Sequence, residues 1–357
     1  MFHISAVVTF ALAATGICVA SVLPAHQAVP IAVTGEWTAE ARHAPTEADP
    51  RVQLNLRTAS GEGRWGLGVL ARELEGLPPA ALTGVARDAR FAWRREAGIF
   101  RFEGSFDNGR GAGTFTFSPN PSYIAGMATL GYQSLAPDKL MRLAAVDVTQ
   151  SYVRELSQAG YRDLPFDDLV RMRIHGVAAD MIEELRTLGY SGLSSDELVR
   201  MRIHGATPQF ARAIAEAGYK GLPVDMLVRF RIHKVTPELV SSLVERGYKG
   251  IPADELVRMR IHGVNVSEVD ELEKLGLDAL DVEELIRMRI HRVTPVFVRE
   301  MREVGFGSLS AAQLVKMRIH RVDGQFVRDL VADGYTNLSP SDVIDVAIHG
   351  PRRARRR

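Results

Sequence analysis

The pattern of apolar and polar residues changes twice along the chain and divides it into segments with different predicted structures. An apolar run without charged residues occupies residues 4–23. From about residue 35 to 121, apolar and polar residues alternate, as at residues 51–57, which is typical of strands with one buried face. Beyond residue 121, apolar residues recur at helical spacing. The pattern predicts an α+β protein with separate domains: a small antiparallel β domain followed by an α-solenoid.

The alternating segment predicts five or six antiparallel strands at residues 37–121, preceded by a linker at residues 26–36. Aromatic residues at alternate positions on both sides of Asn108-Gly109 are a strong β-hairpin signal. Trp37, Trp65 and Trp93 are the predicted large side chains of the core. The glycines at 109, 111 and 113 are spaced like a phosphate-binding loop, but no helical pattern follows them, so we interpret them as turn glycines.

An internal repeat of constant length fills residues 122–350. Glycine recurs once per copy, at positions 131, 160, 189, 218, 247, 276, 305 and 334, and is usually followed by tyrosine. In the copy at residues 189–217, Ser194 and Glu197 predict a capping box before a first helix, and Thr207-Pro208 predicts the start of a second. Neither short helix can bury its apolar side alone, so the copies are predicted to stack as 29-residue helix-turn-helix repeats.

One arginine of each repeat falls within the apolar arc of the first helix. On a helical wheel, Leu198, Val199, Met201 and Ile203 form this arc, and Arg202 lies inside it. The position never carries lysine in the internal copies, whereas the first and last copies have alanine. A planar guanidinium with five donors is harder to replace than an exposed point charge. The arginines in this series are Arg173, Arg202, Arg231, Arg260, Arg289 and Arg318.

We expect these arginines to bridge adjacent repeats. Their guanidinium groups are predicted to donate to helix-end carbonyls or an acidic side chain, and to stack on the tyrosine of the Gly-Tyr pair. The alternative interpretation is that each stem lies over apolar surface while the charged group reaches water.

One histidine per repeat ends the first helix: His175, His204, His233, His262, His291, His320 and His349. Zinc needs three or four ligands within about 2.1 Å of one point, whereas stacked helices lie about 8–10 Å apart. We therefore predict a helix-end role, favoured by the helix dipole, and no metal or other cofactor. Seven equivalent imidazoles would also make the array sensitive to pH.

The charges argue against a nucleic-acid partner, because Lys and Arg number 44 and Asp and Glu number 43. Arg200 and His204 share one side of their helix, and Asp196 and Glu197 precede Arg200 by one turn, so this surface is predicted to neutralise itself. The tail at residues 351–357 differs, because its charges are all positive and unpaired. Its basic residues are Arg352, Arg353, Arg355, Arg356 and Arg357.

Residues 1–25, with the apolar run from Ile4 to Leu23, are predicted to be a signal peptide or a membrane anchor. Either would place the rest of the chain in the periplasm, free or anchored to the membrane. Cys18 is the only cysteine, which excludes a disulfide framework and leaves a mature chain suited to an oxidising compartment. The apolar run and the basic tail, Arg352 to Arg357, are the candidate points of membrane contact.

One copy departs from the pattern of the others. Asn265 stands where most copies have the capping residue of the second helix, and Glu268 takes the position of Phe210. We expect this helix to begin later, at Ser267, with Asp270 completing its cap. The irregular copy is a candidate for shaping a binding surface, although simple sequence drift explains it equally well.

The repeat at residues 189–210, GYSGLSSDELVRMRIHGATPQF, resembles tandem repeats behind the catalytic domain of some bacterial zinc metallopeptidases of the β-lactam-sensor type. The segments REAGIF at 95–100 and FDNGRG at 106–111 are similar to the region preceding those repeats. The zinc signature His-Glu-x-x-His is absent. The resemblance therefore implies the C-terminal extension of such proteins without the catalytic domain, with a role near envelope sensing or signalling.

The leading hypothesis is a non-catalytic bacterial envelope protein that acts as a scaffold for a protein or peptide partner, because repeat arrays form extended binding surfaces and no catalytic constellation is visible. The alternative is a β domain that is enzymatic or binds a small ligand, with the solenoid as a spacer. Its site would lie at the dense polar cluster Arg94, Arg95 and Glu96. A third hypothesis is a purely structural envelope protein.

Overall fold

The computed structural model describes residues 32–42, 50–61, 63–278 and 280–350. The chain forms two compact units. The first contains most of the residues up to Pro121, and the second contains the helices from residue 122 onward together with the short segment Arg95–Gly98. The predicted N-terminal segment at residues 1–25 and the basic tail at residues 351–357 lie outside the described residues.

The first unit contains a seven-stranded sheet with the strand order β3-β2-β1-β7-β6-β5-β4. Antiparallel pairing joins β1 to β2 and β7, β2 to β3, and β4 to β5. The strands are β1 (Val33–Arg42), β2 (Arg51–Thr58), β3 (Arg64–Leu70), β4 (Leu74–Glu75), β5 (Val85–Arg95), β6 (Gly98–Asp107) and β7 (Arg110–Pro119). The prediction of an antiparallel β domain is confirmed, with seven strands instead of five or six, because the two-residue β4 is too short for an alternation pattern to reveal.

The core of the sheet is aromatic. Trp37 is buried and its ring packs edge-on against Phe91 at 5.3 Å, while its indole nitrogen donates to the carbonyls of Glu103 and Thr114. Trp93 is also buried, but Trp65 is only half-buried, contrary to its predicted place in the core. β1 begins at Val33, within the segment interpreted as a linker, because residues 33–36 already pair with β7.

The predicted hairpin joins β6 to β7. Asn108 and Gly109 both have positive φ, as a tight two-residue hairpin turn requires. Of the three spaced glycines, Gly109 lies in this turn and Gly111 and Gly113 lie in β7. A Cβ on Gly113 would stand 2.0 Å from the Glu103 carbonyl oxygen, so this glycine allows two strands to approach closely.

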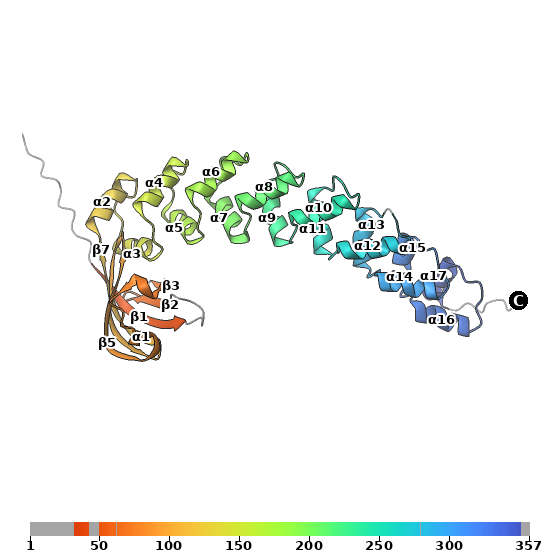
Figure 1. Cartoon of the computed structure of the whole chain (residues 1–357), viewed down its shortest axis with the longest axis horizontal. Helices are drawn as coiled ribbons and strands as arrows, with labels where there is room; N and C mark the ends of the chain where they lie inside the picture. Colours follow the sequence, from red (N-terminus) through yellow and green to blue (C-terminus); the bar gives the residue numbers. More distant parts are fainter. Residues whose placement is uncertain (1–31, 43–49, 62, 279, 351–357) are drawn as a thin grey trace, which may run out of the picture. The chain divides into compact units, whose positions relative to one another are not determined.

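The second unit is an array of helix pairs (Figure 1). The first helices of the repeats are α3 (Pro137–Ala145), α5 (Phe166–Ile174), α7 (Ser195–His204), α9 (Val224–Ile232), α11 (Ala253–Ile261), α13 (Val282–Ile290), α15 (Ala311–Ile319) and α17 (Pro340–His349). The second helices are α2 (Pro121–Thr129), α4 (Gln150–Gln158), α6 (Ala179–Thr187), α8 (Pro208–Glu216), α10 (Pro237–Glu245), α12 (Val266–Lys274), α14 (Pro295–Glu303) and α16 (Gly324–Ala332). A short helix, α1 (Ala80–Thr83), belongs to the β unit.

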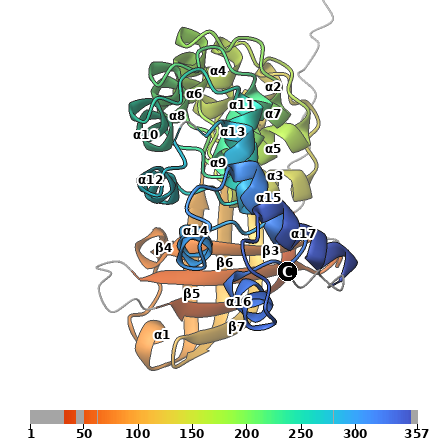
Figure 2. The same ribbon diagram turned by 90° about the vertical axis from the view of Figure 1, so that its right-hand side faces the viewer.

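Helices of the same kind stack on one another along the array. First helices contact first helices, as in α5, α7 and α9, and second helices contact second helices, as in α4, α6 and α8. In Figure 1 the second helices lie above the first ones in the green part of the array, whereas α14 and α16 lie below α13 and α15. Figure 2, viewed from the right-hand side of Figure 1, shows α11, α13, α15 and α17 as one continuous row. The array therefore twists along its length, as stacked repeats commonly do.

The helix ends follow the local sequence signals. Ser194 and Glu197 form the predicted capping box, and the Thr207 side chain caps α8 with Pro208 in its first turn. Each such cap contributes about 1 kcal/mol. α12 begins at Val266, not at Ser267, and this prediction is wrong: Asn265 caps the helix through the Ser267 amide at 3.1 Å. Asparagine caps as well as threonine, so the start stays in register with the other copies.

Candidate functional site

The six internal arginines interpreted as bridging residues contact the preceding repeat. The Nε atoms of Arg202, Arg260 and Arg318 donate to the carbonyl oxygens of the histidines 27 residues earlier, at 3.1, 3.3 and 3.5 Å. Arg173 instead donates to Asp147 at 2.9 Å, because the incomplete first copies offer a carboxylate at that helix end. In each case the guanidinium lies against the end of the first helix of the repeat before it.

Aromatic stacking of these arginines involves a different ring from the predicted one. Arg231 lies over Phe210 at 5.0 Å, and Arg173 and Arg318 lie over Tyr152 and Phe297 at 4.9 Å. These rings stand near the start of the second helix that precedes the arginine in the chain, and are not the tyrosines of the Gly-Tyr pair. A wheel of the first helix alone cannot locate this neighbour.

The irregular copy replaces this ring with a charge. Glu268 occupies the ring position, and both of its carboxylate oxygens accept from Arg289 Nη1 at 3.1 Å. The exchange keeps the contact between repeats but converts it from a cation–π contact to an ion pair. Asp270, predicted to cap the helix, accepts two hydrogen bonds from Arg246 instead.

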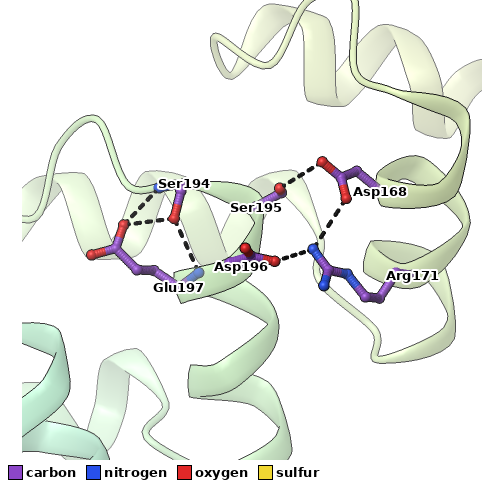
Figure 3. A network of polar contacts seen from close by, with 6 residues as sticks. All are labelled: Asp168, Arg171, Ser194, Ser195, Asp196 and Glu197. Atoms are coloured by element: carbon purple, nitrogen blue, oxygen red, sulfur yellow. Dashed lines mark hydrogen bonds and ion pairs between the residues drawn. The ribbon is translucent and has the colours of Figure 1, made fainter.

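The other arginine series of the first helices forms an ion-pair ladder between repeats. From Arg142 to Arg258, each of these arginines pairs with an acid near the start of the next first helix. The rungs are Arg142–Asp167 at 2.9 Å, Arg171–Asp196, Arg200–Asp225 at 2.8 Å, Arg229–Asp254 at 2.7 Å and Arg258–Glu283 at 3.1 Å. Figure 3 shows one rung, with Ser194 and Glu197 closing the capping box beside it.

This ladder corrects the predicted pairing of Arg200 with Asp196 and Glu197 on its own helix. Asp196 pairs with Arg171 of the preceding repeat, and Glu197 caps α7. The ladder stops at Arg287, because residue 312 is alanine. Lysine occurs in this series only at Lys316, whose partner position, residue 341, is serine. Exposed pairs of this kind contribute less than about 1 kcal/mol each, so their main effect is to neutralise this side of the helices.

The tyrosines of the Gly-Tyr pairs connect each repeat to the next through the backbone. The hydroxyl groups of Tyr132, Tyr161, Tyr190 and Tyr219 donate to the carbonyl 32 residues later, at 3.0, 2.5, 2.9 and 2.6 Å. Burial raises the pKa of each of these phenols, and raises the pKa of Tyr132 to about 12. We call these four residues the bridging tyrosines, and the folded array holds them in the protonated form.

Alkaline titration checks this arrangement. A raised pKa means that the fold binds the phenolic proton more tightly, so the stabilisation is complete below about pH 10 and is lost as the pH rises towards 12. All eight tyrosines lie in the array. We expect tyrosinate absorbance and loss of helical circular dichroism to rise together between about pH 10 and 12. Ionisation of the bridging tyrosines near pH 10 with full retention of helix would contradict the contacts described.

The seven histidines lie at the ends of the first helices. Five, including His175 and His291, cap the helix, while His204 and His349 are the last helical residues. His349 Nδ1 lies 3.2 Å from the Asp345 carbonyl oxygen and 2.9 Å from its carboxylate. Within the described chain, the other six rings make no hydrogen bond, and no group of three potential metal ligands converges.

The residue before the histidine is an exposed isoleucine in every first helix from α5 to α17. We call this series the isoleucine ladder: Ile174, Ile203, Ile232, Ile261, Ile290, Ile319 and Ile348, which are 48–59% exposed. The helical wheel placed Ile203 in the buried arc, and this was wrong. Val199 lies closer to the middle of the arc and is buried, whereas Ile203 lies at the edge of the arc and is exposed to solvent.

The polar cluster proposed as a ligand site in the β domain is occupied by structural contacts. Arg94 pairs with Glu75 at 2.6 Å, and Arg95 lies 3.9 Å from Asp147. Glu96 accepts from the Gln150 amide at the start of α4 at 3.1 Å. A pocket of about 590 Å³ does lie in the β unit, but Thr34, Glu36, Arg57, Thr114 and neighbouring residues line it, and not this cluster.

Comparisons with known proteins do not name a relative. No protein-family model matches the chain, and no curated protein is similar to it. The resemblance to repeats of sensor-type metallopeptidases therefore stays a prediction. None of the helices in the described part of the chain is both long and apolar enough to span a membrane.

Proposed function

We propose that the protein is a non-catalytic interaction scaffold of the bacterial envelope, which holds a protein or peptide partner along the row of first helices. The isoleucine ladder is the observation that carries this proposal. Seven large apolar side chains stand about half exposed at the same position of successive repeats. Exposing an apolar side chain to water is unfavourable, and none of these side chains belongs to the buried core. Repetition in register produces one extended apolar stripe.

The contacts between repeats support the same function. Arginines, tyrosines and ion pairs hold successive first helices in one fixed offset. A preorganised surface loses little conformational freedom when a partner binds. The exposed valines of the second helices, such as Val244 and Val331, do not recur in successive copies, so the first-helix row is the better candidate.

The location in the envelope rests on the uncharged run at residues 4–23 and on the resemblance to envelope-sensor repeats. A second candidate function, binding of a small ligand by the β unit, has one observation in its favour. The pocket near Thr34 and Arg57 is large enough for a small molecule. Its lining mixes polar side chains, such as Glu36, with the apolar Phe115.

Affinity purification of the full chain from bacterial envelope extract tests the scaffold function. The test variant carries Ile203→Ser, Ile232→Ser and Ile261→Ser, and the control carries Val244→Ser, Val296→Ser and Val331→Ser on exposed positions of second helices. We expect wild type and control to retain the same specific partner and the ladder variant to lose it. Retention by all three proteins, or by none, would contradict the proposal.

A further inference from the structure

The residues that flank the isoleucine ladder are basic. Each ladder isoleucine from Ile174 to Ile319 stands between an arginine and a histidine, so the repeating unit is Arg-Ile-His. The next position carries glycine in some copies and Lys234, Arg292 or Arg321 in others. The ladder thus follows a line of arginines, joined in three copies by a further lysine or arginine, at the carboxyl ends of the first helices, where the helix dipole also favours cations.

Three of these cations occupy strained positions without ion pairs. Lys234, Arg292 and Arg321 have φ values of 57–58°, in the left-handed region that glycine adopts in the neighbouring copies. The side chains are exposed, and none forms an ion pair within the described chain. A non-glycine residue in this conformation is strained. Local stability therefore does not account for basic residues at these positions.

Most of the second arginine series of the first helices is already neutralised. Arg171, Arg200 and Arg229 pair with Asp196, Asp225 and Asp254 of the ion-pair ladder. Beside the isoleucines, only Arg173 and Arg289 of the preceding arginines form ion pairs within the described chain, with Asp147 and Glu268. Much of the unpaired positive charge of the first-helix row therefore lies beside the isoleucines. A partner that covers the ladder must supply apolar side chains and, next to them, negative charge.

The repeat spacing restricts the backbone of such a partner. Stacked helices lie about 8–10 Å apart, so successive isoleucines recur at about this distance. An extended polyproline-II segment rises about 3.1 Å per residue and places every third side chain on one side, at intervals of about 9.3 Å. A helix places equivalent side chains every seven residues, about 10.5 Å apart, and this mismatch accumulates along the row.

From these observations we propose that the isoleucine ladder binds an extended acidic peptide segment, with an apolar residue at every third position and carboxylates between them. The carboxylates pair with Lys234, Arg292 and Arg321 and with the arginines beside the isoleucines that form no ion pair, Arg202, Arg231, Arg260 and Arg318. This inference rests on the scaffold function proposed above and names the chemistry of its partner. An acidic protein tail or linker of about 20 residues would reach along the ladder.

Binding of synthetic peptides to the full chain, measured by fluorescence anisotropy, tests the proposal. The probe is a peptide of about 20 residues with leucine at every third position and aspartate or glutamate between. A scrambled peptide of the same composition and a peptide with lysine in place of the acids are the controls. We expect the acidic register-matched peptide to bind at least about tenfold tighter than either control, and more weakly as salt concentration rises.

Variants of the chain locate the binding. The ladder variant, with Ile203→Ser, Ile232→Ser and Ile261→Ser, should bind the peptide about tenfold or more weakly. The double variant Lys234→Gly and Arg292→Gly should bind it about threefold to tenfold more weakly. The valine control variant should bind it as tightly as the wild type. The glycine substitutions relieve the left-handed strain, so they do not endanger folding.

The proposal would be overturned if the scrambled peptide or the lysine peptide bound as tightly as the acidic register-matched peptide. It would also be overturned if the chain bound vesicles of equal phosphatidylglycerol and phosphatidylcholine through the ladder but did not bind the peptide. The last result would assign the ladder to an anionic membrane surface. If the envelope partner still depended on the ladder while the acidic peptide failed, the scaffold function would stand and only the partner chemistry would be wrong.

Discussion

Replacing Phe230 with alanine is expected to lower the free energy of unfolding of the array by about 3–5 kcal/mol. Phe230 is fully buried in α9 and packs edge-on against Tyr219 with ring centroids 6.0 Å apart. Removal of the ring leaves a cavity between α9 and its neighbours and removes the support for a bridging tyrosine. Since each repeat is stabilised chiefly by its neighbours, the loss extends beyond one helix pair.

Ile232→Ala is the matched control, two residues further along the same helix. Ile232 is half-exposed, and alanine has the higher helix propensity, so we expect a cost below about 1 kcal/mol. Helical circular dichroism in a denaturant titration reports the array. Tryptophan fluorescence reports the first unit, because Trp37, Trp65 and Trp93 all lie there. Equal costs for the two substitutions would contradict the assignment of the isoleucine ladder to the surface.

Removing one complete period is expected to leave a folded array, whereas removing half a period is expected to abolish cooperative folding of the helices around the junction. Deletion of residues 189–217 joins Leu188 to Gly218. Tyr161 then meets Leu222 in place of Leu193, and Arg171 meets Asp225 in place of Asp196, so the contacts between repeats are restored with equivalent partners.

Deletion of residues 189–203 serves as the comparison. It removes α7 almost entirely and places a second helix where the stack requires a first one, so buried apolar residues would face polar surface. Thermal unfolding followed by circular dichroism measures both deletions. The full-period deletion should keep a single sharp transition, lowered by the loss of one repeat and one interface. A broad or absent transition after the full-period deletion would contradict the equivalence of the repeats.

The fold class could be predicted from the sequence because both domains depend on short-range signals. Alternating aromatic residues around Asn108-Gly109 predict the hairpin, and the capping residue Ser194 predicts the start of α7. The constant spacing of the repeated glycines and histidines predicts stacking without any structural information. β4 was missed because two residues carry no alternation pattern. The start of α12 was predicted wrongly because asparagine caps a helix at least as well as the threonine of the other copies.

The candidate site was less predictable, because it depends on the offset between neighbouring repeats. A helical wheel describes one helix alone, so it could not show that Arg200 reaches Asp225 or that Arg231 lies over Phe210. It also placed Ile203 in the core, since it does not show where the next helix ends. The correlated loss of partners, with Ala312 opposite Arg287, is a signal in the sequence that would reveal the ion-pair ladder.

Site-specific photocrosslinking in bacterial cells tests most directly whether the isoleucine ladder is the surface that binds a partner. A photoreactive side chain is placed at Ile232 of the full chain in one strain and at Val244, an exposed position of α10, in another. The account predicts a discrete crosslinked species from position 232 and none from position 244. Crosslinking from both positions alike, or from Val244 only, would contradict it.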